Sequence, residues 1–148
     1  MLRRVDYSVI VPASTDAAFL AFLHLERLLH RGIYDEASWV EGVPWQVGSR
    51  LRYGILKPIP ATVTAVVTSI SLPHSVNLLN HALGITAEEN VTFAPDRGGT
   101  RIRIIMNMFG KSNELSERVI HEAVTFIARD ALDTVLALCR RRRPSAAG

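Results

Sequence analysis

Apolar and polar residues alternate along the chain between Thr100 and Phe109. A period of two is typical of a β-strand that buries one face and leaves the other mostly in water. The face expected to point inward carries Ile102, Ile104, Met106 and Met108, and the opposite face carries Arg101, Arg103, Ile105 and Asn107. A second β-like segment, Thr86 to Ala94, precedes this strand. Gly98 and Gly99 are expected to supply the positive φ angles of a hairpin turn between the two.

The segment from Ser112 to about Arg142 changes to a helical period. Its apolar residues recur every three or four positions, which predicts one amphipathic helix about 45 Å long. Ser112 or Asn113 is expected to cap its first turn. The stripe expected to be buried consists of Ile120, Val124, Ile127, Ala131, Val135 and Leu138. The residues expected to face water are Arg118, Glu122, Arg129 and Asp133.

The earlier part of the chain predicts one strand, two short helices and a run of strands. Val5 to Val11 alternates as a strand, and Ser14 or Thr15 is expected to cap the first helix, which ends near Leu25. A second short helix is expected over Glu26–Arg31, ended by Gly32. Further strands are expected at Trp39–Val40, Ser49–Leu56, Ala61–Ile70 and Val76–Leu83.

This order of elements predicts an α+β fold, because the strands and the helices are segregated along the chain. A long helix needs a large apolar surface to lie on, and a curved antiparallel sheet wrapped around it supplies one. At 148 residues the chain is expected to form one domain, residues 1–143, followed by a disordered tail, residues 144–148.

Charge and cysteine content narrow the expected partners and compartment. The net charge is +3, but four of the 17 basic residues are the consecutive arginines Arg140–Arg143, and the remaining 13 face 14 acidic residues. No aromatic residues interleave with these arginines, so we expect no nucleic-acid partner. No stretch approaches the length of apolar sequence that a membrane span needs. The single cysteine, Cys139, fits a reducing compartment, and we expect a cytoplasmic protein.

No motif in the sequence predicts a metal, a cofactor or a nucleophile. The five histidines, at positions 24, 30, 74, 81 and 121, do not have the spacing of metal ligands. His121-Glu122 begins like a zinc-protease motif, but Thr125 stands where the second histidine is needed. We therefore expect neither a metal nor a cofactor.

Several short segments together resemble the SRPBCC superfamily, also called START-like or birch-pollen-allergen-like. The resemblance is nearest to its polyketide cyclase/dehydrase and lipid-transport group, and it covers about Val5 to Arg141. The segments that carry it are Val9–Ala13, Val47–Arg52, Leu72–Val76, and Phe93–Pro95 with Gly99–Arg101. The resemblance implies a helix-grip fold, in which the sheet grips the C-terminal helix around an apolar cavity. It does not imply one activity, because the fold hosts carriers, sensors and enzymes.

The leading interpretation is therefore a protein that binds a small hydrophobic or amphipathic ligand, lipid-like or polyketide-like. Apolar surface desolvated in the cavity would supply the affinity. The residues expected to line the cavity are Leu51, Tyr53, Val91, Phe93, Ile104, Met106, Val124 and Ile127.

Strand alternation also points polar groups toward that cavity. If Val91 points inward, so does Glu89, and the same rule places Asn80 inward on the preceding strand. A second interpretation is therefore an enzyme of the cyclase/dehydrase type, in which Glu89 moves a proton with Asn80 or Tyr53. The alternative for Glu89 is a place in water near a strand end, or an ion pair with an arginine such as Arg52 or Arg103.

A third interpretation is an interaction protein whose cavity is vestigial and whose surface aromatic residues form a homodimer.

Four aromatic residues are candidates to line or gate a cavity mouth: Trp39, Trp45, Tyr34 and Tyr53. Trp45 lies in a turn bounded by glycine and proline, which favours a rim or an oligomer contact over the core.

Overall fold

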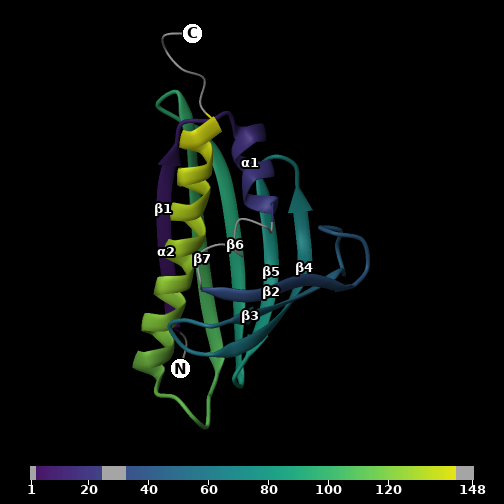
Figure 1. Cartoon of the computed structure of the whole chain (residues 1–148), viewed down its shortest axis with the longest axis vertical. Helices are drawn as coiled ribbons and strands as arrows, with labels where there is room; N and C mark the ends of the chain where they lie inside the picture. Colours follow the sequence, from purple (N-terminus) through teal and green to yellow (C-terminus); the bar gives the residue numbers. More distant parts are fainter. Residues whose placement is uncertain (1–2, 25–32, 143–148) are drawn as a thin grey trace.

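The computed structural model describes residues 3–24 and 33–142, which form seven strands and two helices (Figure 1). In chain order these are β1 (Arg3–Val11), α1 (Thr15–Leu23), β2 (Tyr34–Glu41), β3 (Arg50–Ile55), β4 (Ala61–Ser71), β5 (Ser75–Ala82), β6 (Ile85–Asp96), β7 (Gly99–Gly110) and α2 (Glu117–Arg142). The structure describes one short helix between β1 and β2. The expected second one, Glu26–Arg31, and the expected tail, 144–148, lie outside the described residues.

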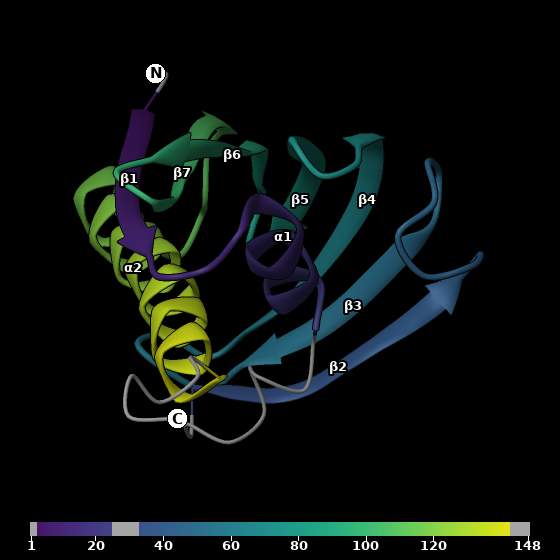
Figure 2. The same cartoon turned by 90° about the horizontal axis from the view of Figure 1, so that it is seen from above.

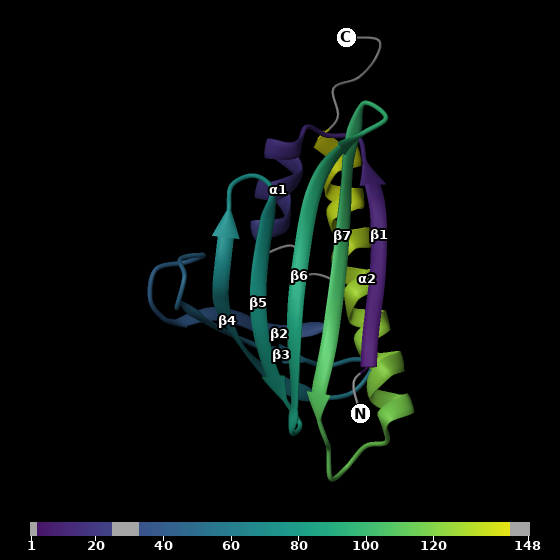
Figure 3. The same cartoon turned by 180° about the vertical axis from the view of Figure 1, so that it is seen from behind.

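All seven strands belong to one antiparallel sheet in the order β1-β7-β6-β5-β4-β3-β2. Strands β2 to β7 follow one another as neighbours, and β1 pairs with β7. The sheet is curved, and both helices lie on its concave side, as the view from above shows (Figure 2). Figure 3 shows the convex face, with the strands in front of α2. The α+β helix-grip arrangement expected from the sequence is confirmed.

The alternation in β7 sorts its side chains as predicted. Ile102, Ile104, Met106 and Met108 are all buried, whereas Arg101 and Arg103 are exposed. The inward side chains pack beneath α2, whose Leu132 and Val135 are fully buried. This packing explains why a period of two is so clear in this strand, since only one of its faces meets the helices.

The turn between β6 and β7 differs from the prediction by one residue. The positive φ angles belong to Arg97, at 52°, and Gly98, at 81°, so these two residues form the hairpin turn. Gly99 serves a different purpose. A Cβ atom at Gly99 would lie 2.3 Å from the carbonyl oxygen of Val11, so glycine lets β1 approach β7 there.

The helix caps confirm one prediction and correct another. Ser14 caps α1, because its hydroxyl accepts a hydrogen bond from the Ala17 amide. Helix α2 begins at Glu117, where Ser116 accepts from the Val119 amide at 3.3 Å, so the predicted start near Ser112 is wrong. The Ser112 hydroxyl instead accepts hydrogen bonds from the amides of Glu114 and Leu115, which stabilise a turn ahead of the helix.

The outer side of α2 is more covered than the sequence indicates. Arg118, Glu122 and Arg129 are exposed as expected, but Asp133 is half-buried. Its carboxylate accepts a hydrogen bond of 2.9 Å from the Tyr7 hydroxyl. The reason is that β1, the edge strand, lies beside this part of the helix and brings Tyr7 to it.

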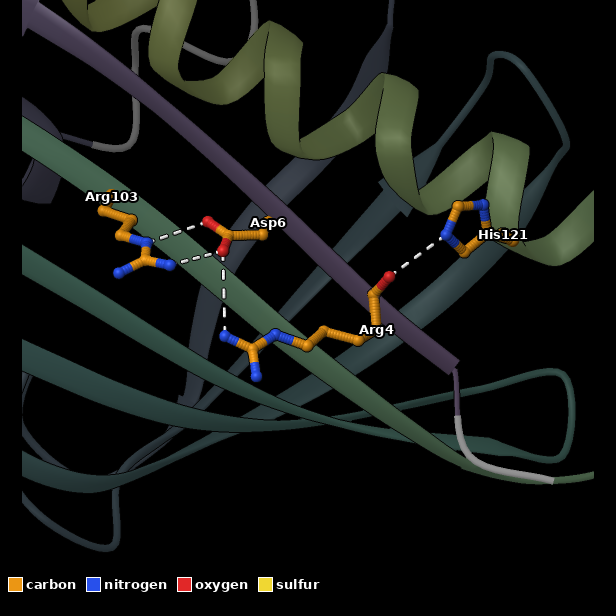
Figure 4. A network of polar contacts seen from close by, with 4 residues as sticks. All are labelled: Arg4, Asp6, Arg103 and His121. Atoms are coloured by element: carbon orange, nitrogen blue, oxygen red, sulfur yellow. Dashed lines mark hydrogen bonds and ion pairs between the residues drawn. The ribbon is translucent and has the colours of Figure 1, made fainter.

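A polar network on the outside of the sheet ties three elements together (Figure 4). Arg103 of β7 donates from its Nε atom to Asp6 of β1 at 2.9 Å, and Arg4 lies 3.7 Å from the same carboxylate. The hydrogen bond from Arg103 lowers the pKa of the Asp6 carboxyl. The ring of His121 on α2 contacts the Arg4 carbonyl oxygen at 3.1 Å. These contacts join β1 to both of its neighbours, β7 and α2.

No helix in the described part of the chain is both long and apolar enough to cross a membrane.

Candidate functional site

Two hollows lie between the concave face of the sheet and α2. The first, here called the outer cavity, has a volume of about 110 Å³. Strands β3 to β7 supply most of its wall, and α2 closes it with Ile120, Ala123, Val124 and Ile127. Three connecting segments complete it with Pro58, Ile59, Leu83 and Leu115. Because Pro58 is exposed, this cavity reaches the surface at the β3–β4 connection.

The second hollow, here called the inner cavity, has a volume of about 70 Å³. It lies toward α1 and the β2–β3 connection, which contribute Phe22 and Trp45. Strands supply Leu51, Leu78, Glu89 and Ile104, and α2 supplies Ala128 and Ala131. Four residues line both cavities and so form a shared wall between them: Tyr53, Asn80, Met106 and Ile127.

A chain of polar groups runs along one side of this shared wall. The Tyr53 hydroxyl donates to Asn80 Oδ1 at 3.5 Å, and Asn80 Nδ2 donates to Glu89 Oε1 at 2.9 Å. The same amide nitrogen lies 3.5 Å from the Ala87 carbonyl oxygen. The strand register explains the grouping, since Asn80 lies directly opposite Ala87, two residues from Glu89 on the same face of β6.

Burial keeps the hydroxyl of Tyr53, the first member of this polar chain, protonated. Desolvation raises the pKa of Tyr53 well above its ordinary value, and the negative charge of Glu89 and the nearby Tyr34 raise it further. Tyr53 is therefore a neutral hydroxyl at physiological pH, able to donate one hydrogen bond and to accept others. The Tyr34 ring packs edge-on against it, with the ring centroids 5.9 Å apart.

Trp45 fastens the β2–β3 connection to the end of α1. Its indole N–H donates to the Leu23 carbonyl oxygen at 2.9 Å, and its ring meets Trp39 edge-on at 5.1 Å. The residue has a positive φ of 61° and lines the inner cavity. The tryptophan therefore lies at the wall of the site and closes the end that faces α1.

The structure brings together six of the eight residues expected from the sequence to line a cavity. Leu51 and Ile104 line the inner cavity, Val124 lines the outer one, and three members of the shared wall line both. Val91 and Phe93 instead lie in the packed core. The Phe93 ring meets those of Phe19 and Phe22 at 4.8 Å and 5.7 Å, because α1 fills this end of the concave face.

The three polar candidates, Glu89, Asn80 and Tyr53, all border the inner cavity. Arg103, considered from the sequence as a partner for Glu89, is paired with Asp6 on the opposite face of the sheet. The carboxylate of Glu89 therefore belongs to the interior side, with Asn80 as a hydrogen-bond partner.

Sequence reasoning missed the part of the outer cavity that comes from connecting segments. Pro58, Ile59, Leu83 and Leu115 follow no regular period, so alternation does not assign them a face. The usable signal is that apolar residues stand where turns normally carry polar ones.

Chemically, the two cavities are apolar surfaces with one polar edge. Among the described residues that line them, the ionisable ones are Tyr34, Tyr53 and Glu89. In the same described part of the chain, no cluster of three histidine, cysteine or acidic residues has the geometry to hold a metal ion. The arrangement can enclose an apolar body and satisfy a polar group at its edge.

No family model and no curated protein sequence matches the chain. Solved structures do match it over nearly its whole length. One is the Zhui aromatase/cyclase from Streptomyces sp. R1128, with a TM-score of 0.83 and 14% identity, covering 100% of this chain and 99% of that one. Another is Ara h 8.0201, with a TM-score of 0.80 and 10% identity, covering 96% and 100%.

A third similar structure is norcoclaurine synthase from Thalictrum flavum in complex with dopamine and hydroxybenzaldehyde. Its TM-score is 0.75 at 14% identity, and the match covers 98% of this chain and 90% of that chain. At such identities these similarities establish the fold that the chains share.

Proposed function

We propose that this chain, which has the helix-grip fold of the SRPBCC or START-like superfamily, binds a small apolar or amphipathic molecule between its sheet and α2. The observation that carries the proposal is the pair of adjacent apolar cavities with the polar groups of Tyr53, Asn80 and Glu89 at their border. We also propose that it acts in the cytoplasm, since its single cysteine, Cys139, suits a reducing compartment.

The size of the outer cavity indicates the scale of the ligand. An apolar cavity of about 150 Å³ can hold a benzene molecule. The outer cavity, at about 110 Å³ and open at Pro58, is on the scale of one ring or a short branched chain. Desolvation of that body against the wall would supply the affinity, at about 25 cal/mol per Å² of buried apolar area before the entropic costs of binding.

Polar groups at the shared wall favour a ligand with one polar end. The Tyr53 hydroxyl lies 3.5 Å from Asn80 Oδ1, a long contact, and its oxygen can accept a hydrogen bond from another group. A hydroxyl on the ligand can donate to it. Two of the similar structures, an aromatase/cyclase and a synthase bound to dopamine and hydroxybenzaldehyde, support an oxygenated ring as the first probe.

The test is isothermal titration calorimetry of the full chain with 4-methylphenol, repeated at several temperatures. We expect saturable binding of one molecule per chain with a negative heat-capacity change, the sign of apolar burial. Toluene and indole, which have the same scale, serve as companion probes. Failure of all three to bind saturably would contradict the proposed function.

A second candidate function is proton transfer by Glu89, as in an enzyme of the cyclase/dehydrase type. The specific observation in its favour is the 2.9 Å hydrogen bond from Asn80, which orients the Glu89 carboxylate beside the inner cavity. A carboxylate held in this way can remove a proton from a carbon next to a carbonyl group and return it later. Tyr53, which stays protonated, can turn its hydroxyl away from the long 3.5 Å contact with Asn80 and donate to the developing oxyanion instead.

Deuterium exchange into phenylacetone in heavy water tests this second candidate. The Glu89 carboxylate would take a proton from the carbon between ring and carbonyl, leave an enolate and return a deuteron. We expect the wild-type chain to accelerate this exchange, and we expect the acceleration by Glu89→Gln to be about a hundredfold smaller than that by the wild type. Glu88→Gln is the matched control, because Glu88 is the exposed neighbour of Glu89 in β6. Exchange that is equally fast with and without protein, or unchanged in Glu89→Gln, would contradict proton transfer.

The third interpretation, an interaction protein with a vestigial cavity, predicts a filled interior and an exposed aromatic patch. The two cavities and the half-buried Trp39 and Trp45 favour the ligand-binding proposal over it. A homodimer stays a prediction.

A further inference from the structure

We propose that Met106 and Ile127 are specificity-determining residues that limit the ligand to one ring-sized body by separating the outer from the inner cavity. This inference rests on the proposed function and adds to it the length of ligand that the site accepts. In the wild-type chain, a one-ring molecule occupies the outer cavity, and a rigid molecule long enough to enter both cavities is disfavoured.

The geometry behind this inference is the composition of the shared wall. Two of its members, Tyr53 and Asn80, are polar and hydrogen-bonded to each other, and they come from β3 and β5. The other two are apolar and come from opposite layers. Met106 belongs to β7 of the sheet, and Ile127 belongs to α2, which lies over the sheet. The wall therefore has a polar half and an apolar half that connects the sheet to the helix.

The polar half is held mainly by the 2.9 Å hydrogen bond from Asn80 to Glu89, and the contact between Tyr53 and Asn80 is longer, at 3.5 Å. Asn80 is buried, its oxygen accepts from Tyr53, and its amide nitrogen donates to Glu89. Moving either side chain away would leave buried polar groups without these bonds, which is unfavourable. A long ligand therefore gains no room from this side of the wall.

The apolar half contains the one side chain that can yield. Ile127 is branched at Cβ, and such side chains are nearly restricted to one χ1 rotamer in a helix. Met106 is unbranched and has three rotatable bonds, so its thioether end can move. Its Cα lies opposite Val5 on one side and Glu89 on the other, at a sheet position between β1 and β6. Displacing the buried methionine would cost its packing contacts, so in the wild type it keeps the two cavities separate, and shortening its side chain removes that obstacle.

Truncating this methionine tests the inference. We would measure the affinities of 4-methylphenol, which has one ring, and 4-phenylphenol, which has two, for the wild type and for Met106→Ala. The expected result is a shift of the affinity ratio toward 4-phenylphenol by about tenfold, because the two cavities become continuous. The ratio is informative even if the variant is less stable, since both probes bind the same folded protein.

Met108→Ala is the matched control. Met108 is the same residue type on the same face of β7, two residues away, and it is buried at 3% exposure. It lines neither the outer nor the inner cavity. Its truncation should cost stability in the same way but leave the affinity ratio unchanged.

A second variant, Ile127→Val, removes one methyl group from the helix side of the wall with little risk to folding. It should shift the ratio in the same direction as Met106→Ala, by a smaller factor. If 4-methylphenol binds the wild type and neither variant shifts the ratio relative to Met108→Ala, the inference is wrong while the proposed function stands. If none of 4-methylphenol, toluene and indole binds the wild type, both are overturned; if toluene or indole binds and 4-methylphenol does not, that probe replaces 4-methylphenol in the ratio.

Discussion

Gly99→Ala is expected to destabilise the protein by about 3 kcal/mol, in the upper range for overpacking of a closed structure. The new Cβ atom would lie 2.3 Å from the Val11 carbonyl oxygen, and this neighbour is backbone, which cannot rotate away. Strand β1 would have to move off β7 at the end where Val11 pairs with Thr100. That movement would also disturb the fully buried Thr100, whose hydroxyl donates to the Ala13 carbonyl oxygen at 2.8 Å.

The neighbouring glycine supplies the control for this experiment. A Cβ atom at Gly98 would have no neighbouring atom within 4 Å. The loss of stability in Gly98→Ala therefore comes only from the positive φ of 81° and should be about 1–2 kcal/mol. Chemical denaturation of both variants measures the difference. An equal loss of stability in the two would contradict a close approach of β1 at Gly99.

The two glycines also show how far the sequence can predict this fold. Two adjacent glycines between alternating segments predict a hairpin, and the hairpin is there. Which residues take positive φ depends on the register of β6 against β7, and a close approach by a strand almost 90 residues earlier has no local signal. The clear period of β7 was predictable because this strand buries a single face. On α2 the prediction is less accurate, since of the six residues expected to be buried only Val135 is buried and the other five are half-buried.

Strand β2 shows where periodicity is lost. The sequence predicts a strand that carries Trp39 and Val40 but does not mark its start, which the structure places at Tyr34. It is an edge strand with two irregularities in its register against β3, and most of its side chains are exposed. An edge strand with so little buried surface has no reason to keep a regular alternation.

A second large effect is expected at the outer cavity. Ala123→Leu should weaken the binding of 4-methylphenol by about tenfold or more, which corresponds to 1.4 kcal/mol. Ala123 lies on α2 and lines the outer cavity, so the larger side chain would occupy part of its 110 Å³. The variant should fold at least as stably as the wild type, since filling a cavity commonly adds stability and leucine suits a helix.

Ala137→Leu provides the comparison for this variant. Ala137 is also a half-buried alanine on α2, but it lines neither the outer nor the inner cavity. Calorimetric titration of both variants should show the loss of affinity in Ala123→Leu alone. Equal affinities in the two variants would place the ligand somewhere other than the outer cavity.

Strand alternation predicted which way side chains within regular elements face. Alternation directed Glu89 and Asn80 toward the interior, and both border the inner cavity. Val91 and Phe93 obey the same alternation and also point inward, but both lie in the packed core, where α1 covers Phe93. The period of a strand predicts which face of the sheet a side chain lies on. Whether the space over that face is filled or forms a cavity depends on how a distant helix packs there.

The most direct test of a ligand site between the sheet and α2 is a nuclear Overhauser measurement with 4-methylphenol bound to methyl-labelled protein. Contacts from the ring protons of the probe to the methyl groups of Ile120, Val124 and Met106 are expected, since these three residues line the outer cavity. Contacts only to exposed apolar side chains such as Leu20 and Val47 would place the probe on the surface and contradict an interior site.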